Sequence, residues 1–345
     1  RSRRTTVLSE VERRARGALC VSIAALLVAC GNHGRSTTTS SIAEETKVDN
    51  AVGRSIQALV RPSDLDPDKV ALGKRLFSDP LLSGDRTISC ASCHDLSTGG
   101  ADARRYSLGI GGQVGRINAP TVFNADLNVK QFWDGRAASL ADQVDGPVSD
   151  PTEMGGRWSE IIGLVGADPW YRTAFSREYP EGVTRSSISD AIATYERALV
   201  TVGSPFDRWV AGDENALSAE AKEGHALFET IGCASCHQGK NVGGNMFEKI
   251  GIMEDYFAER GGPITEADLG RFNVTKDPRD KHAFRVPSLR LASKTAPYFH
   301  DGSIEKLDDA ILAMGRYQLG KTLSPHEVSR LSAFVVSLAG EVPRP

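Results

Sequence analysis

The strongest constraint on this sequence is a short cysteine and histidine pattern that occurs twice. Residues 90–94 read CASCH, and residues 233–237 read CASCH again. Each copy follows a G-x-x-L-F element, at residues 73–77 in the first case and 224–228 in the second. Repeated patterns at matched positions indicate internal duplication. We therefore interpret the chain as a tandem of two related modules.

A C-x-x-C-H pattern is typical of the attachment site for a c-type haem. Two thioether bonds hold the porphyrin, and the adjacent histidine binds the iron. A zinc site or a redox dithiol does not explain a histidine next to both cysteine pairs, which leaves structural disulfides as the minor alternative. The two copies thus predict two haem sites with these residues: Cys90, Cys93 and His94 in the first, and Cys233, Cys236 and His237 in the second.

The remaining pattern is mainly helical, with no sustained alternation of the kind that strands show. Residues 187–200 place Ile188, Ile192, Tyr195 and Leu199 on one face, and residues 303–315 carry a similar apolar stripe. A third helix is expected after residue 324, where a capping box precedes Val328, Leu331, Val335 and Leu338. Residues 202–218 contain Gly and Pro and are the expected interdomain connection.

The N-terminal region is typical of an export signal. Residues 1–17 are rich in arginine, and residues 18–29 form an apolar run too short to span a bilayer. The run ends in a sequence that resembles a bacterial lipoprotein cleavage box, with Cys30 as the lipidated residue; a plain secretory signal is the alternative. Residues 31–55 are polar and predict a flexible tether.

The composition limits the class of partner. Charged residues make up 25% of the chain and hydrophobic ones 40%, which is globular. The formal net charge is −3 and becomes more negative once the arginine-rich N-terminal segment is removed. A nucleic-acid partner is therefore disfavoured, whereas a small basic protein partner is compatible with the charge.

Residues 107–121, SLGIGGQVGRINAPT, form a glycine-rich loop. A dinucleotide-binding fingerprint needs glycine at position 114, a strand before it and a helix after it. The residue there is Val114, and neither element is expected. A nucleotide site in this loop is therefore disfavoured.

The function of a haem depends on the ligand opposite its histidine, because a thioether raises the reduction potential and an open position admits peroxide. The sequence has no histidine between His94 and His225, so the first site lacks an obvious second imidazole. At the second site, Met246, Met253 and Met314 are alternatives that spacing alone does not separate.

From about residue 56 to the C-terminus, the chain resembles the bacterial dihaem cytochrome c peroxidases. The resemblance rests on the following motifs: ISCASCHDLSTGG, RINAPTVFNADLNVKQFWDGRAASL, SPFDRWVAG, IGCASCHQG, GRFNVTKD, TAPYFHDGS and AILAMGRYQLG. It implies an all-α fold of two tandem cytochrome c-like domains, at residues 56–205 and 206–345, each with one covalent c-type haem. It also implies a periplasmic homodimer that reduces hydrogen peroxide with electrons from a small cytochrome c or cupredoxin.

Residue by residue, the resemblance makes the first haem the peroxide-reacting centre, with Glu153 and Gln143 in its pocket. The second haem is the electron-entry centre, with Met314 as the second iron ligand. Trp133 matches a tryptophan between the two haems. The implied interdomain calcium site involves Asn118, Thr295 and Pro297, and His300 matches a histidine of open role near the second haem.

One position departs from the family. In much of the family, a histidine in the glycine-rich loop caps the first haem in the oxidised enzyme, and the aligned residue here is Ile110. A hydrocarbon side chain does not ligate iron, so we hypothesise an oxidised site that is already open. Tyr106 and Gln113 stay open as alternative residues for reaching the iron.

Two other functions stay open at this stage. The first is a dihaem maturation enzyme that oxidises a partner protein; that enzyme has tyrosine where this chain has Met314, although an open oxidised site would be common to both. The second is an electron carrier without catalysis, which Ile110 and Glu153 disfavour.

Overall fold

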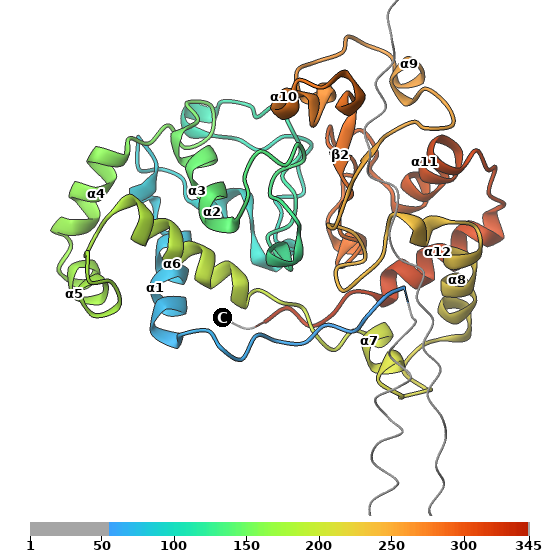
Figure 1. Ribbon diagram of the computed structural model, residues 1–345, viewed down its shortest axis with the longest axis horizontal. Coiled ribbons are helices and arrows are strands. Elements are labelled where there is room, and N and C mark those ends of the chain that lie inside the picture. Colours follow the sequence, from blue (N-terminus) through green and yellow to red (C-terminus); the bar gives the residue numbers. More distant parts are fainter. Residues whose placement is uncertain (1–54, 344–345) are drawn as a thin grey trace, which may run out of the picture. The chain divides into compact units, whose positions relative to one another are not determined.

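The computed structural model describes residues 55–343, which lie within one compact unit. The expected signal segment, Cys30 and the tether up to residue 54 lie outside the described residues. Within residues 55–343 no helix is long and apolar enough to cross a membrane. The elements are predominantly helical, which agrees with the predicted all-α fold (Figure 1).

The helices fall into two groups along the chain (Figure 1). The first group comprises α1 (Pro67–Ser78), α2 (Cys90–Cys93), α3 (Leu140–Ser149), α4 (Trp158–Ala167), α5 (Pro169–Glu178) and α6 (Arg185–Ala198). The second comprises α7 (Pro205–Val210), α8 (Ala219–Thr230), α9 (Tyr256–Arg260), α10 (Phe272–Thr275), α11 (Leu307–Leu319) and α12 (Pro325–Ser337). The only regular strands among the described residues are β1 (Phe247–Lys249) and β2 (Ala283–Arg285), paired antiparallel.

Each group contains a matching pair of crossed helices. In the first group α1 crosses α6 at Gly73, where an added Cβ would lie 1.9 Å from the carbonyl oxygen of Ala191. In the second group α8 crosses α12 at Gly224, where an added Cβ would lie 1.9 Å from the carbonyl oxygen of Arg330. Only glycine permits backbones to approach this closely. The glycine of each G-x-x-L-F element therefore lies at a helix crossing, and the two crossings are equivalent.

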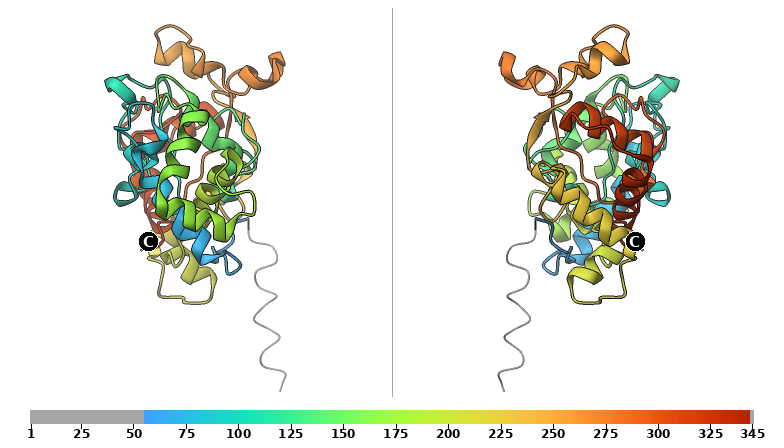
Figure 2. Two further views of the ribbon diagram at one scale, coloured as in Figure 1. Left: turned by 90° about the vertical axis from the view of Figure 1, so that its left-hand side faces the viewer. Right: turned by 90° about the vertical axis from the view of Figure 1, so that its right-hand side faces the viewer.

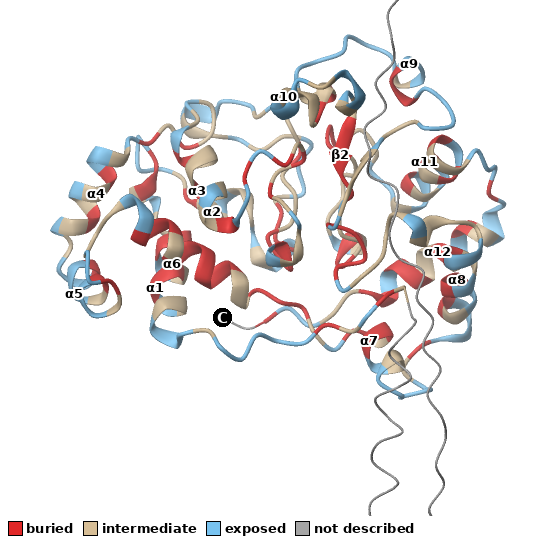
Figure 3. Ribbon diagram, viewed as in Figure 1, coloured by how far each residue is buried: buried red, intermediate tan, exposed pale blue. Residues whose placement is uncertain are grey.

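Two hydrophobic clusters are built on these crossings. The first cluster includes Leu76, Phe77 and Ile188, and the second includes Phe228 and Phe334. Helix α6 is buried along most of its length, and its predicted apolar face is inside the first cluster (Figure 3).

The predicted helix starts are partly confirmed. The capping box at Ser324 is present and begins α12, and all four predicted apolar residues of that helix are buried. The helix predicted from residue 303 begins instead at Leu307, because Ile304 forms a β-bridge with Tyr298. The predicted connection 202–218 also contains α7, which Ser204 caps and Pro205 opens.

The chain crosses between the two clusters at both ends of the described region. Ile56, where the predicted first domain begins, packs in the second cluster and bridges Gly239. Near the other end, the Glu341 amide donates to the Val202 carbonyl at 2.9 Å. The first core therefore begins at α1 rather than at residue 56. Figure 2 shows the segment with α9 and α10 at the opposite end from α7.

Candidate haem-binding site

The first CASCH segment lies on a single helical turn. Ser89 and Ser92 fix this turn reciprocally, because the Ser92 hydroxyl accepts from the Ser89 amide at 3.0 Å and the Ser92 amide donates to the Ser89 carbonyl at 3.0 Å. The turn holds Cys90 and Cys93 at the edge of a cavity of about 140 Å³, which His94 also lines. We call this cavity the first pocket.

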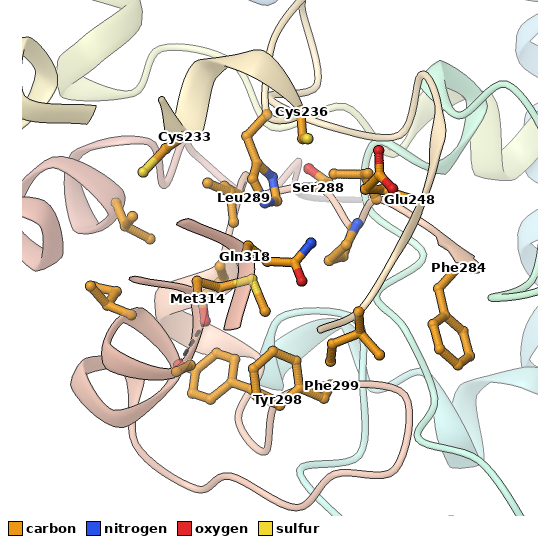
Figure 4. Close-up of a pocket in the computed structure, with 18 of the residues that line it drawn as sticks. Cys233, Cys236, Glu248, Phe284, Ser288, Leu289, Tyr298, Phe299, Met314 and Gln318 are labelled. Carbon is orange, nitrogen blue, oxygen red and sulfur yellow. Dashed lines mark hydrogen bonds between the residues drawn. The ribbon is translucent and has the colours of Figure 1, made fainter. Parts of the chain in front are cut away.

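The second CASCH segment forms a 3₁₀ turn at Cys233–Ser235. Gly232 precedes it with φ of 107°, a conformation that favours glycine. Cys233 and Cys236 line a larger cavity of about 250 Å³ together with His237, which we call the second pocket (Figure 4).

Both histidines are oriented in the same way. Nδ1 of His94 donates to the Gly100 carbonyl at 3.2 Å, and Nδ1 of His237 donates to the Val242 carbonyl at 3.3 Å. A proton on Nδ1 leaves the lone pair on Nε2 for a metal ion. Burial lowers the pKa of His94 and lowers that of His237 to about 4, so both rings are neutral at physiological pH, the form that binds iron.

The four cysteines of the two CASCH segments are free, and none of them forms a disulfide. Burial raises the pKa of Cys90 to about 12 and that of Cys233 to about 11, because both thiols lie in apolar surroundings. No group of three or more His, Cys, Asp or Glu side chains suited to a metal ion occurs in residues 55–343. A pair of free thiols beside a neutral imidazole, at the edge of a mainly apolar cavity, fits a covalently attached haem in each pocket.

The structure separates the three methionines that the sequence left as alternatives. Met314 of α11 lines the second pocket with His237, and Figure 4 shows it across the pocket from Cys236. Met253 is 59% exposed, and neither it nor Met246 lines this pocket.

Two polar side chains from separate segments reach the first pocket. Gln143 comes from α3, and Glu153 from the turn that follows it. Burial is the main cause that raises the pKa of Glu153, with a contribution from Asp150. The pocket thus contains a carboxyl group that keeps its proton to a higher pH than an exposed glutamate does.

Ile110 does not line the first pocket. Its amide donates to the Glu153 carbonyl at 2.8 Å, and its side chain lies over Gly155, where an added Cβ would be 2.4 Å from Ile110 Cδ1. Tyr106 and Gln113 do not line the pocket either, and the side-chain amide of Gln113 donates to the Pro151 carbonyl at 2.8 Å. The glycine-rich loop is thus attached to the Glu153 turn.

Trp133 is buried where the two groups of helices meet. Its indole N–H donates to the Asn118 carbonyl at 2.9 Å, and its own carbonyl accepts from the Arg285 amide at 2.8 Å. The ring lines the second pocket and packs edge-on against His300. His300 is itself fixed by a 2.8 Å hydrogen bond to Asp268.

The three residues of the expected calcium site, Asn118, Thr295 and Pro297, all line the second pocket. The side-chain amide nitrogen of Asn118 donates to the Arg104 carbonyl at 2.9 Å. Calcium binding at these three residues stays a prediction.

Sequence reasoning missed three buried side chains at these cavities. Met154 and Glu196 line the first pocket, and Arg285 lines both pockets. The only signal in the sequence for Glu196 is its place beside Tyr195 on a helix that contributes to the core. For Met154 and Arg285 the sequence offers no such signal.

Comparison with known proteins identifies the family. Residues 67–215 match the di-haem cytochrome c peroxidase family. The cytochrome c peroxidase Ccp of Escherichia coli (strain K12) is 50% identical over 286 residues, 83% of this chain, and the match spans 61% of that relative's length. The cytochrome c551 peroxidase of Nitrosomonas europaea is 42% identical over 294 residues, 85% of this chain and 86% of the relative.

The fold is likewise shared with a solved structure. A MauG-like protein associated with microbial copper homeostasis superposes with a TM-score of 0.72 at 29% identity, over 83% of this chain and 93% of that one. Since the match to the Nitrosomonas europaea relative extends over most of both sequences, the chain belongs to the di-haem cytochrome c peroxidase family of oxidoreductases.

Proposed function

We propose that this protein reduces hydrogen peroxide to water with electrons from a small donor protein, a cytochrome c or a cupredoxin. Two electrons and two protons convert one peroxide molecule to two water molecules. The peroxidase names of relatives at 50% and 42% identity support this reaction. The observation that carries the proposal is the first pocket, where Glu153 and Gln143 meet a single histidine among the lining residues.

Each pocket would hold one c-type haem through its cysteine pair, with Nε2 of His94 or His237 on the iron. When bound, these groups supply one-electron redox centres. In the first pocket the chain's own side chains would supply a proton and orient the substrate. The Glu153 carboxyl, whose pKa burial raises, would hold a proton for the departing oxygen, and the Gln143 amide would orient the substrate.

The second pocket would receive the electrons. Met314 lines the same pocket as His237 and would supply a thioether ligand, and such a ligand raises a haem's reduction potential. Trp133 lines this pocket and donates to the carbonyl of Asn118, and the next residue, Ala119, lines both pockets. We assign Trp133 as the aromatic bridge for electron transfer.

Ile110 stands where much of the family has a capping histidine, and it does not line the first pocket. Its side chain packs on Gly155, and no imidazole besides His94 lines the pocket. We therefore propose that the oxidised enzyme reacts with peroxide without prior reduction. The expected periplasmic location, Cys30 lipid anchor, two-domain division at residues 205–206, calcium at Asn118 and homodimer belong to the same proposal.

A maturation-type oxidase acting on a partner protein is the second candidate. The MauG-like structure at 29% identity and Ile110 favour it. Met314 argues against it, because that enzyme has tyrosine at this position.

Stopped-flow mixing of oxidised holoprotein with peroxide tests the proposal, with and without a reduced cytochrome c. We expect multiple turnovers of donor oxidation from the oxidised protein, and a large loss in Glu153→Gln. Glu160→Gln, an exposed carboxylate on α4, is the matched control and should leave the rate unchanged. A long-lived oxidised product without donor turnover would favour the maturation-type function, and inertness would favour an electron carrier.

A further inference from the structure

Arg285 is a buried cation that borders both pockets. It is the last residue of β2, is 4% exposed and lines both the first and the second pocket. Its backbone amide donates to the Trp133 carbonyl at 2.8 Å, so it stands beside an aromatic residue that lines the second pocket.

The guanidinium of Arg285 has few partners in the chain. Nε donates to the Phe132 carbonyl at 3.3 Å, and no carboxylate within the described residues forms an ion pair with it. Burial lowers the pKa of Arg285 to about 10, so the group stays positively charged at neutral pH. A buried charge without a counter-charge is costly.

Arg290 shows how this chain neutralises a buried arginine that it keeps for its own structure. Arg290 is fully buried, and its Nη1 contacts Asp207 at 2.7 Å. Its Nε and Nη2 donate to the carbonyls of Lys240 and Gln57. Arg285 has no carboxylate partner of this kind among the described residues, and its one side-chain hydrogen bond is made by Nε. Its other guanidinium N–H groups can therefore bind an anion that the chain does not supply.

The chemistry of a haem provides such anions, because every c-type haem carries two propionate carboxylates. We propose that Arg285 is a shared anion-binding residue, which binds propionates of the groups in both pockets and holds both reduction potentials up. Planar guanidinium groups suit carboxylates, with several N–H donors in a fixed fork. This inference rests on the haem occupancy in the proposed function but not on peroxide as the substrate.

The sign of the effect follows from electrostatics. Reduction lowers the positive charge of an iron centre, so a nearby cation favours the reduced form. Removing the charge should therefore lower both potentials; a tenfold change in a one-electron equilibrium corresponds to a shift of about 59 mV.

Spectroelectrochemical titration of the dihaem holoprotein tests this. Arg285→Gln should lower both midpoint potentials, and Arg285→Lys, which keeps the charge, should lower them less. Arg271→Gln is the matched control, since Arg271 also donates to a backbone carbonyl, that of Asp134, but lines neither pocket.

Unchanged potentials in Arg285→Gln, or a shift in one haem alone, would overturn the proposal. If Arg285→Gln does not fold, equal shifts in Arg285→Lys and Arg271→Gln would overturn it. These potentials are measurable even if the protein does not turn over peroxide, so the two proposals fail independently.

Discussion

Glu196 provides a quantitative test of the first pocket's interior. This residue of α6 is 5% exposed and lines the first pocket. No hydrogen bond from the described residues reaches its carboxyl group. Burial, together with the nearby Asp126, raises the pKa of Glu196 to about 8 from the ordinary value of 4.5. Glu196→Gln replaces this group with a neutral one of nearly the same shape.

The direction of the pH effect follows from proton binding. Below pH 4.5 both the folded and the unfolded chain hold this proton. Between pH 4.5 and about 8 the folded chain keeps the proton and the unfolded chain loses it, so stability falls as pH rises. Each pH unit in this window costs about 1.4 kcal/mol, which makes about 4 kcal/mol between roughly pH 5 and pH 8.

Denaturant unfolding of wild type and Glu196→Gln at a series of pH values measures this cost. The difference in the free energy of unfolding should grow in favour of Glu196→Gln as pH rises, and should level off above about pH 8. Glu181→Gln, an exposed residue before α6, is the control and should show no such trend. A difference between wild type and Glu196→Gln that is flat with pH would refute the reasoning.

Three further substitutions test other parts of the account. Met314→Leu should lower the potential of the second haem in a redox titration, because the thioether ligand is lost; an unchanged potential would show that Met314 is not the ligand. Gly224→Ala should cost about 2–3 kcal/mol by denaturant unfolding, because its Cβ meets the Arg330 carbonyl, whereas Gly163→Ala in open space should be neutral or stabilising. Trp133→Phe should slow electron transfer between the haems in stopped-flow and cost about 1–2 kcal/mol, since the buried Asn118 carbonyl loses its donor; an unchanged rate would exclude the bridge.

Local patterns in the sequence predicted the helical core well. The face of Ile188, Ile192 and Tyr195 is buried as periodicity indicates, and the Ser324 capping box begins a helix. The duplicated G-x-x-L-F element predicted related modules, and Gly73 and Gly224 occupy equivalent helix crossings. These features depend on contacts within a few residues or on direct repetition, which a single sequence records.

Long-range packing could not be predicted in the same way. Ile56 packs against the second cluster, and Arg285 joins the two pockets, through contacts with residues far away in the chain. Nothing local distinguishes a buried arginine from an exposed one. Likewise, the sequence left Met246, Met253 and Met314 as alternatives, and of these three only Met314, on α11, lines the second pocket.

The central claim is that the oxidised enzyme has an open first site because Ile110 replaces a ligating histidine. Electron paramagnetic resonance of the fully oxidised holoprotein tests it most directly. We predict one high-spin ferric haem, in the first pocket, and one low-spin haem with histidine and methionine ligands. Two low-spin haems would contradict the claim and would direct attention to Met154, the thioether that lines the first pocket.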